Sequence, residues 1–193
     1  MIKQQSPPPE IPALNRTQVL VGMAVTAIIL WIMAKLWLYL GQVYLLRWYW
    51  SSQHLFLGAG IGLIISILSA IIYRLCPPYR RSADYYLQIV LTPLILTDLI
   101  WLGLLPGLSE ELLFRGVMLP ALGLDYAAVV ISSLSFGILH LSSPQQWPYM
   151  IWATCIGLIL GSSALMTGNL LVPLIAHMTT NWVSAYFWKR KKH

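Results

Sequence analysis

Two adjacent carboxylates, Glu110 and Glu111, lie in a stretch of sequence that is otherwise apolar and long enough to be in lipid. The chain has six acidic residues in all, so two adjacent ones in an apolar stretch indicate a functional role. A charge near the centre of a bilayer costs at least ~2.5 kcal/mol on insertion scales. The other polar groups at membrane depth that can share a site with them are His140, His177 and Asn181. Together these groups predict hydrolytic chemistry inside a membrane.

Helical spacing indicates which of these side chains face the same way. His177 and Asn181 are four residues apart, so a helix places both on one face. Phe136 and His140 have the same spacing, and the aromatic ring can therefore form a wall of the site beneath the imidazole.

The two carboxylates are expected to have different roles. Glu111 precedes Arg115 by four residues, which is the favourable acid-first order for an ion pair on a helix. That pairing neutralises Glu111 and leaves Glu110, about 100° further round the helix, free to face the histidines. We therefore predict that Glu110 is the general base and that Glu111 is a structural partner.

The order of helices predicts how these groups meet. If the helix that starts at Glu110 leaves one side of the membrane, the next helix returns and ends at His140 on that same side. The last helix also returns to it, with His177 ~12 Å along and Asn181 ~6 Å further. The four residues are thus expected in one shallow layer. The basic tail emerges on the same side, which argues that this side is cytosolic.

The composition sets the fold class. The chain has 193 residues, of which 58% are hydrophobic and 9% are charged, whereas soluble domains contain about 25% charged residues. We predict an all-α, polytopic integral membrane bundle of about seven hydrophobic helices, with room for one that is short or re-entrant. The net charge of +6 is concentrated in loops and at the ends. Such clusters set topology and contact anionic lipid headgroups, so the lipid bilayer is an expected partner and nucleic acid is not.

The chain divides into four regions by pattern. Residues 1–16 are predicted to be a flexible polar lead, and residues 17–81 to hold two transmembrane helices with interfacial and basic loops. Residues 82–188 form the core that carries the polar residues above, and residues 189–193 are a basic tail. Because Gly58 and Gly62 are four residues apart, the second helix has a face suited to close helix packing.

The positions of the two basic segments conflict with a topology in which every predicted helix crosses the membrane. Pro106 and Gly107 are expected to break the chain, with Ser109 capping a short helix from Glu110 to about Ala121. The basic loop at 74–81 and the basic tail are then separated by five helices, and both cannot face the cytosol if all five cross. Either the short glutamate helix or the segment that contains Pro93 must be re-entrant or incomplete.

Three motifs together resemble a known family. They are a Glu-Glu-x-x-x-Arg motif that begins at Glu110, a Phe-x-x-x-His motif that ends at His140, and a His-x-x-x-Asn motif that begins at His177. In order and approximate spacing, the chain is similar over roughly residues 85–190 to the CAAX-protease and bacteriocin-processing intramembrane endopeptidases, also called Abi or Rce1-like proteases.

The resemblance implies a multi-helix protease whose site opens to the cytosol. It implies that Glu110 activates water together with His140, and that His177 and Asn181 stabilise the oxyanion. Its implied substrate is a peptide or a membrane protein. Glu111, Arg115 and Phe136 are expected to support the site.

The resemblance also raises the question of a metal, since members of this family are often described as metalloproteases. The chain lacks the His-Glu-x-x-His pattern of zinc proteases. Glu110, His140 and His177 can nevertheless supply three ligands to Zn²⁺ with one open position. We favour hydrolysis without a cofactor, because Glu110 and Asn181 then have clear roles.

Two other functions remain open at this point. The chain can be a non-catalytic membrane scaffold or an immunity-type partner that keeps the motifs for stability, or it can handle a metal or cofactor through its histidines. The substrate, the particular membrane and the oligomeric state do not follow from the sequence.

Overall fold

The computed structural model describes residues 14–192, so most of the predicted N-terminal lead and the last residue of the basic tail lie outside the described residues. Within that range the chain is helical and contains no strand, which confirms the predicted all-α class. The α-helices are α1 (Arg16–Gly41), α2 (Ser52–Leu75), α3 (Pro77–Leu91), α4 (Leu99–Glu111), α5 (Leu119–Ala121), α6 (Tyr126–Leu139), α7 (Trp147–Thr167) and α8 (Leu171–Lys192). Short 3₁₀ turns occupy Leu96–Asp98 (η1) and Pro144–Gln146 (η3), and a π-helix, η2, spans Leu112–Met118.

Several of these helices are long and apolar enough to cross a membrane. Among the residues that the structure describes, α1, α2 and the segment Pro144–Thr167 meet this condition. The segments Pro77–Leu91 and Leu96–Ala121 meet it as a pair bent by 105°, and α6 is a shorter apolar helix. The chain is therefore an integral membrane protein, as the composition predicted.

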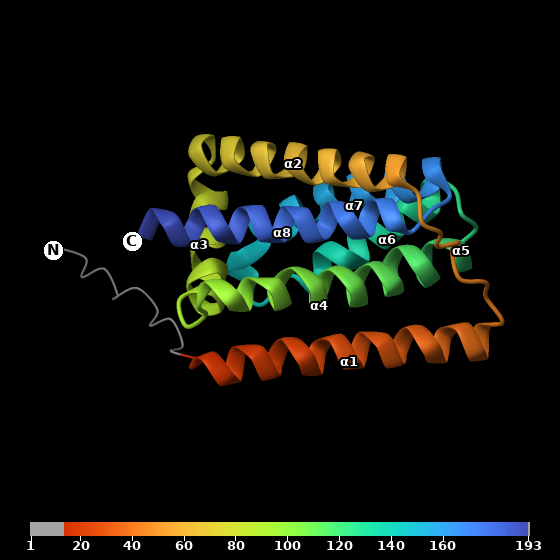
Figure 1. The fold of residues 1–193 in the computed structure, drawn as a ribbon, viewed down its shortest axis with the longest axis horizontal. Helices are drawn as coiled ribbons and strands as arrows, with labels where there is room; N and C mark the ends of the chain where they lie inside the picture. The colour runs from red at the N-terminus through yellow and green to blue at the C-terminus, as the bar shows by residue number, and fades with distance from the viewer. Residues whose placement is uncertain (1–13, 193) are drawn as a thin grey trace, which may run out of the picture.

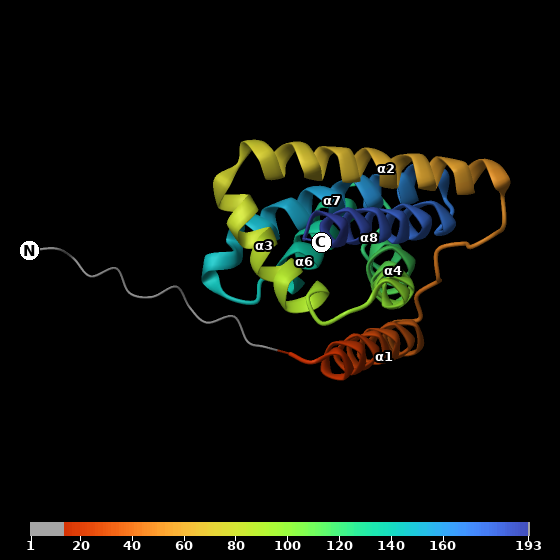
Figure 2. The same ribbon diagram turned by 60° about the vertical axis from the view of Figure 1, so that its left-hand side comes forward.

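The bend explains how both basic segments lie on one side. Helix α3 lies across one end of the bundle, whereas α1, α2, α4 and α8 run along its length (Figures 1 and 2). The start of α1, the end of α2 and the end of α8 are all at the end where α3 lies (Figure 1). Of the two alternatives, it is therefore the segment leading to Pro93 that does not cross as a full span. We call this end of the bundle the basic end.

The predicted break at Pro106–Gly107, with Ser109 as a helix cap, is wrong. Helix α4 runs through Pro106, and the hydroxyl of Ser109 donates to the carbonyl of Leu105 inside the helix, at 2.7 Å. Proline removes the N–H that would bond the carbonyl four residues earlier, here that of Leu102. The side-chain amide of Asn181 in α8 lies 3.5 Å from this carbonyl oxygen and satisfies it. The helix therefore continues, and the chain instead leaves helical geometry at residues 92–95, around Pro93.

A second proline, in α5, is accommodated in the same way. Pro120 leaves the carbonyl of Gly116 without its usual helical donor. The backbone N–H of Leu46, in the loop between α1 and α2, donates to that carbonyl at 2.8 Å. Both prolines are thus tolerated because a group from elsewhere in the chain replaces the missing donor.

Glycines let α8 pack closely between its neighbours. A Cβ atom added at Gly58 or Gly62 of α2 would lie within 2.7 Å of a backbone carbonyl oxygen of α8. The predicted small-residue face of α2 is therefore confirmed as a helix contact. On the other side, a Cβ at Gly107 of α4 would lie 2.6 Å from the Cγ of Met178. These contacts fix α8, which carries His177, against α4, which carries the two glutamates.

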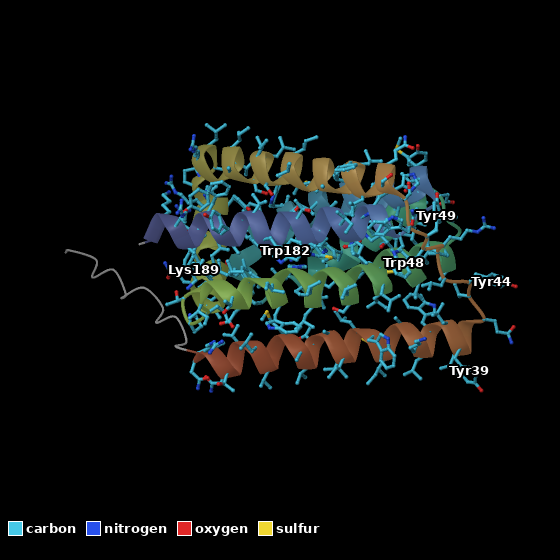
Figure 3. The ribbon with its side chains drawn as sticks, in the orientation of Figure 1. Tyr39, Tyr44, Trp48, Tyr49, Trp182 and Lys189 are labelled. Carbon is cyan, nitrogen blue, oxygen red and sulfur yellow. The ribbon has the colours of Figure 1, made fainter. Side chains whose placement is uncertain are left out.

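The two ends of the bundle differ in their side chains. Tyr39, Tyr44, Trp48 and Tyr49 lie at the end opposite Lys189 (Figure 3). Tyr39 and Tyr44 are more than four-fifths exposed, at 82% and 89%. Aromatic side chains that protrude in this way are typical of the membrane–water interface.

Candidate active site

The carboxylates lie at a change of helical geometry. Glu110 and Glu111 are the last two residues of α4, and the π-helix η2 begins at the next residue. Glu111 is fully buried, as is Arg115 within η2, and Glu110 is 8% exposed. Short π-helical segments inside α-helices occur frequently at functional sites.

Glu111 is the centre of a buried ion pair that also holds a histidine. Its Oε1 atom accepts from the Nη1 of Arg115 at 2.7 Å, which is the pair predicted from the spacing. The same oxygen lies 2.8 Å from Nδ1 of His177. The Nη2 of Arg115 donates to the carbonyl of Gly157 in α7 at 3.1 Å. The arrangement therefore joins α4, η2, α7 and α8, and it does more than the neutralisation that the sequence predicted for Glu111.

Glu110 faces both histidines. Its Oε2 atom is 4.0 Å from Nε2 of His140 and 4.0 Å from Nε2 of His177. That oxygen is buried, and no described residue forms a hydrogen bond to it. A water molecule hydrogen-bonded at ~2.8 Å to each of two atoms fits between partners that are 4.0 Å apart.

The orientation of the His140 ring is fixed by a contact at the C-terminus of α6. His140 caps the C-terminus of α6, and its Nδ1 atom lies 2.8 Å from the carbonyl oxygen of Phe136. A carbonyl only accepts, so Nδ1 carries a proton and Nε2 faces Glu110. The hydroxyl of Tyr86, in α3, donates to the backbone carbonyl of His140 and accepts from the N–H of Ser142 at 3.0 Å. Helix α3 therefore holds the turn that carries this histidine.

Phe136 separates the site from the bundle interior. Its ring centroid lies 4.7 Å from that of His140 and 5.9 Å from that of His177. The guanidinium carbon of Arg115 lies 4.6 Å from the same centroid, within the range of a cation–π contact. The wall role predicted for this ring matches its position.

Asn181 is placed differently from the other predicted residues. Its side-chain nitrogen lies 3.5 Å from the carbonyl oxygen of Leu102, two turns before Glu110 on α4. The structure thus brings Glu110, Glu111, Arg115, His140 and His177 together, and it holds Asn181 against the Leu102 turn of α4. Glu110 lies ~18 Å along the helix that begins near Asp98.

The positive and negative charges of this cluster do not balance. With neutral histidines, two carboxylates and one guanidinium leave a net charge of −1 in a buried site. Unbalanced charge is costly there, and one proton on an imidazole removes it. Because Glu111 holds Nδ1 of His177, a protonated His177 would direct its Nε2–H toward Glu110.

In their observed positions, the candidate ligands Glu110, His140 and His177 fit a zinc ion poorly. Ligand atoms of a tetrahedral zinc with bonds of ~2.0–2.1 Å lie ~3.4 Å apart, and both distances from Glu110 to the histidines are 4.0 Å. Over residues 14–192 no group of three or more His, Cys, Asp or Glu side chains is arranged to hold a metal ion.

Three features of the site were missed at the level of sequence. The contact between Glu111 and His177 joins residues 66 positions apart, and no spacing rule predicts it. Tyr86 was assigned no role, because its partner is the backbone of a distant turn. The π-helix leaves no pattern of residue types, although the Glu-Glu motif directly before it marks the place.

The fold and the site together define an integral membrane protein with two carboxylates, a guanidinium and two imidazoles gathered inside its helices. The family model described as Type II CAAX prenyl endopeptidase Rce1-like matches residues 92–183, the region that holds all three motifs. Over these residues the chain is similar to the Rce1-like family, which confirms the resemblance predicted from the motifs.

A relative supports this assignment. The uncharacterized protein YpbD of Bacillus subtilis (strain 168) is 29% identical over 128 residues. The alignment covers 66% of this chain, and the chain spans 65% of the length of that protein. No solved structure matches.

Proposed function

We propose that this chain is an intramembrane endopeptidase that hydrolyses a peptide bond with water activated by Glu110 and His140. The observation that carries the proposal is the buried Oε2 of Glu110, which is 4.0 Å from two imidazole nitrogens and is unpaired among the described side chains. A buried carboxylate oxygen without a hydrogen-bond partner is costly. A water molecule, which is one of the two reactants, can donate a hydrogen bond to this oxygen.

The chemistry follows from the hydrogen-bonding groups. Nε2 of His140 accepts one hydrogen bond from the water, and Oε2 of Glu110 takes the other proton as the oxygen attacks the carbonyl carbon. Nε2–H of a protonated His177 and the amide of Asn181 donate to the oxyanion that forms. Glu110 then gives its proton to the departing nitrogen as the C–N bond breaks.

Glu111 and Arg115 act on this reaction through position. Glu111 fixes the ring of His177 by its Nδ1 contact, and Arg115 holds Glu111 in place by its hydrogen bond. Histidines held through one ring nitrogen present the other in a defined direction. Phe136 fixes the plane of both rings.

We also propose that the site is reached from the cytosol. Three helix ends carry basic residues at the basic end: the end of α2, the start of α3 and the end of α8, with Arg74, Arg80, Arg81, Lys189 and Arg190. Membrane proteins retain an excess of Lys and Arg on the cytosolic side. A peptide or membrane-protein substrate would therefore approach Glu110 from that end.

A substitution at Glu110 tests the proposal. Glu110→Gln keeps the shape of the side chain but cannot accept the proton, so cleavage should be lost while the purified protein stays folded. Asp125→Asn is the matched control, because Asn caps a helix as well as Asp does, and Asp125 lies at the start of α6, whereas His140 lies at its end. Proteomics of membranes that contain each variant should show uncut substrates accumulating with Glu110→Gln alone. Unchanged proteolysis with that variant would support the non-catalytic alternative instead.

The zinc-dependent form of the same hydrolysis has a separate test. It requires Glu110, His140 and His177 to move closer together around the ion than the 4.0 Å distances allow. We expect the purified protein to keep its activity in a chelator and to contain no stoichiometric metal. Loss of activity in the chelator, with recovery on adding Zn²⁺, would favour the metal-dependent form.

A further inference from the structure

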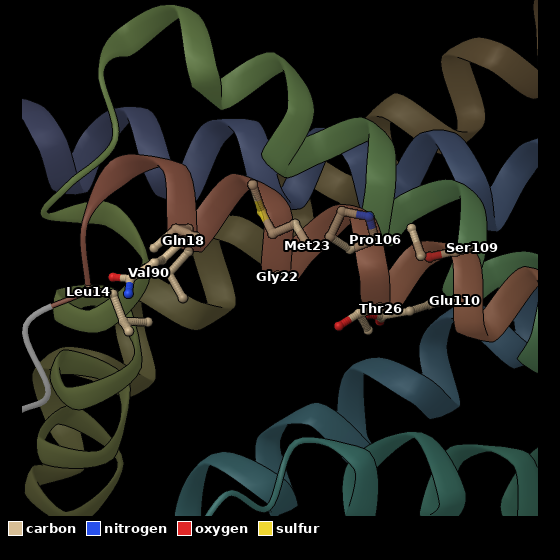
Figure 4. Close-up of a pocket in the computed structure, with 11 residues that line it drawn as sticks. Leu14, Gln18, Gly22, Met23, Thr26, Val90, Pro106, Ser109 and Glu110 are labelled. Carbon is tan, nitrogen blue, oxygen red and sulfur yellow. The ribbon is translucent and has the colours of Figure 1, made fainter.

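A cleft between α1 and α4 leads from the basic end of the bundle to Glu110. Its volume is about 300 Å³, at the lower end of the ~300–1,000 Å³ typical of ligand sites. Leu14 and Val90 line its outer end and Glu110 its inner end (Figure 4). Among the described residues that line it, Glu110 is the one with a charge.

Helix α1 is held against the bundle at two places, and the cleft lies between them. Near the basic end, Arg16 forms two hydrogen bonds of 2.7 Å with the carboxylate of Asp98. Further along, Leu30 and Ala34 are buried in a cluster with residues of η2. Between Val19 and Leu30, α1 has no buried residue.

The walls of the cleft are mostly apolar, and its α1 side includes the small residues Gly22 and Ala27. Gly22, Met23 and Thr26 face Pro106 and Ser109 across it (Figure 4). A Cβ atom added at Gly22 would have no atom within 4 Å, so the missing side chain leaves open space. The hydroxyl proton of Ser109 is already donated within α4. The cleft therefore suits aliphatic groups.

Its length matches a short piece of extended peptide. Gln18 and Thr26 are eight residues apart on α1, which is ~12 Å along the helix. An extended chain rises ~3.3 Å per residue, so the cleft accommodates three to four residues. If the scissile peptide bond lies at Glu110, the substrate residues on one side of that bond would lie inside the cleft.

We propose that this cleft binds the aliphatic side chains of the substrate next to the scissile bond and that Gly22 sets their size. The inference rests on the proposed function. The α1 wall lies outside the residues 92–183 that match the family model, whereas Pro106, Ser109 and Glu110 lie within them. The proposed selectivity element thus lies partly outside the residues that match the family model.

Narrowing the cleft tests the proposal. Gly22→Leu places a side chain in the cleft, and Thr26→Leu narrows it from the next turn. Gly60→Leu is the matched control, because an added Cβ there also meets no atom within 4 Å and Gly60 lies on α2. Newly formed protein ends are mapped by mass spectrometry in membranes with each variant, with Glu110→Gln as the inactive reference.

The two narrowing variants should cut sites with leucine-sized residues beside the scissile bond at least ~10-fold less than wild type. Sites with small residues at those positions should be retained, and Gly60→Leu should resemble wild type. Cleavage patterns shared by Gly22→Leu, Thr26→Leu and wild type would overturn the role of the cleft and leave the proposed function standing. A wild-type pattern in Glu110→Gln would overturn both.

Discussion

The Nδ1 atom of His177 lies 2.8 Å from the Oε1 atom of Glu111, and this contact joins α8 to α4 at the centre of the bundle. The same oxygen also accepts from Arg115. One fully buried carboxylate thus stabilises a buried cation and directs an imidazole toward Glu110. The site and the helix packing around it depend on the same group.

We expect Glu111→Gln to destabilise the protein, because it leaves the guanidinium of Arg115 buried without a counter-charge. Breaking a buried ion pair from one side typically costs ~3–5 kcal/mol. The double variant Glu111→Gln with Arg115→Gln should recover much of this loss, since neither charge remains. Thermal unfolding of the purified proteins in detergent measures both effects. A single variant as stable as wild type would mean that the guanidinium is neutralised by another group.

Asn181→Ala should lower stability by ~1 kcal/mol, because the carbonyl of Leu102 then lacks both its helical donor and the amide. Pro106→Ala restores a backbone N–H at the position that normally bonds this carbonyl. Adding it to Asn181→Ala should therefore recover the stability but not the hydrolysis, if the amide also donates to the oxyanion. Unfolding and cleavage are measured on the two single variants and the double variant. Recovery of both properties together would limit Asn181 to a structural role.

Gly62→Ala should weaken the packing of α2 on α8. The new Cβ would lie 2.5 Å from the carbonyl oxygen of Ala176 and 2.7 Å from the Cβ of Thr179, so the helices must move apart. Overpacking of this kind costs ~1–3 kcal/mol. Gly60→Ala, two residues earlier on the same helix, meets open space and should be neutral or stabilising. Equal melting temperatures for the two variants would contradict the close contact.

Much of this architecture follows from the sequence alone. Continuous apolar runs identify the helices because no other element satisfies the backbone in lipid. The predicted pairing of Glu111 with Arg115 depends on helical periodicity and is present. The three motifs indicated the family that the family model supports.

The tertiary structure determined contacts between distant residues that local sequence patterns cannot predict. Pro106 was expected to end a helix, but Asn181, 75 positions later, supplies a donor for the carbonyl that this proline frees. Glu111 was expected to pair within its own helix, and it also binds His177 on another. Helical periodicity fixes which residues share a face. The pairing of polar groups between distant segments depends on how the helices pack, because a buried donor or acceptor must find its partner wherever the fold places one.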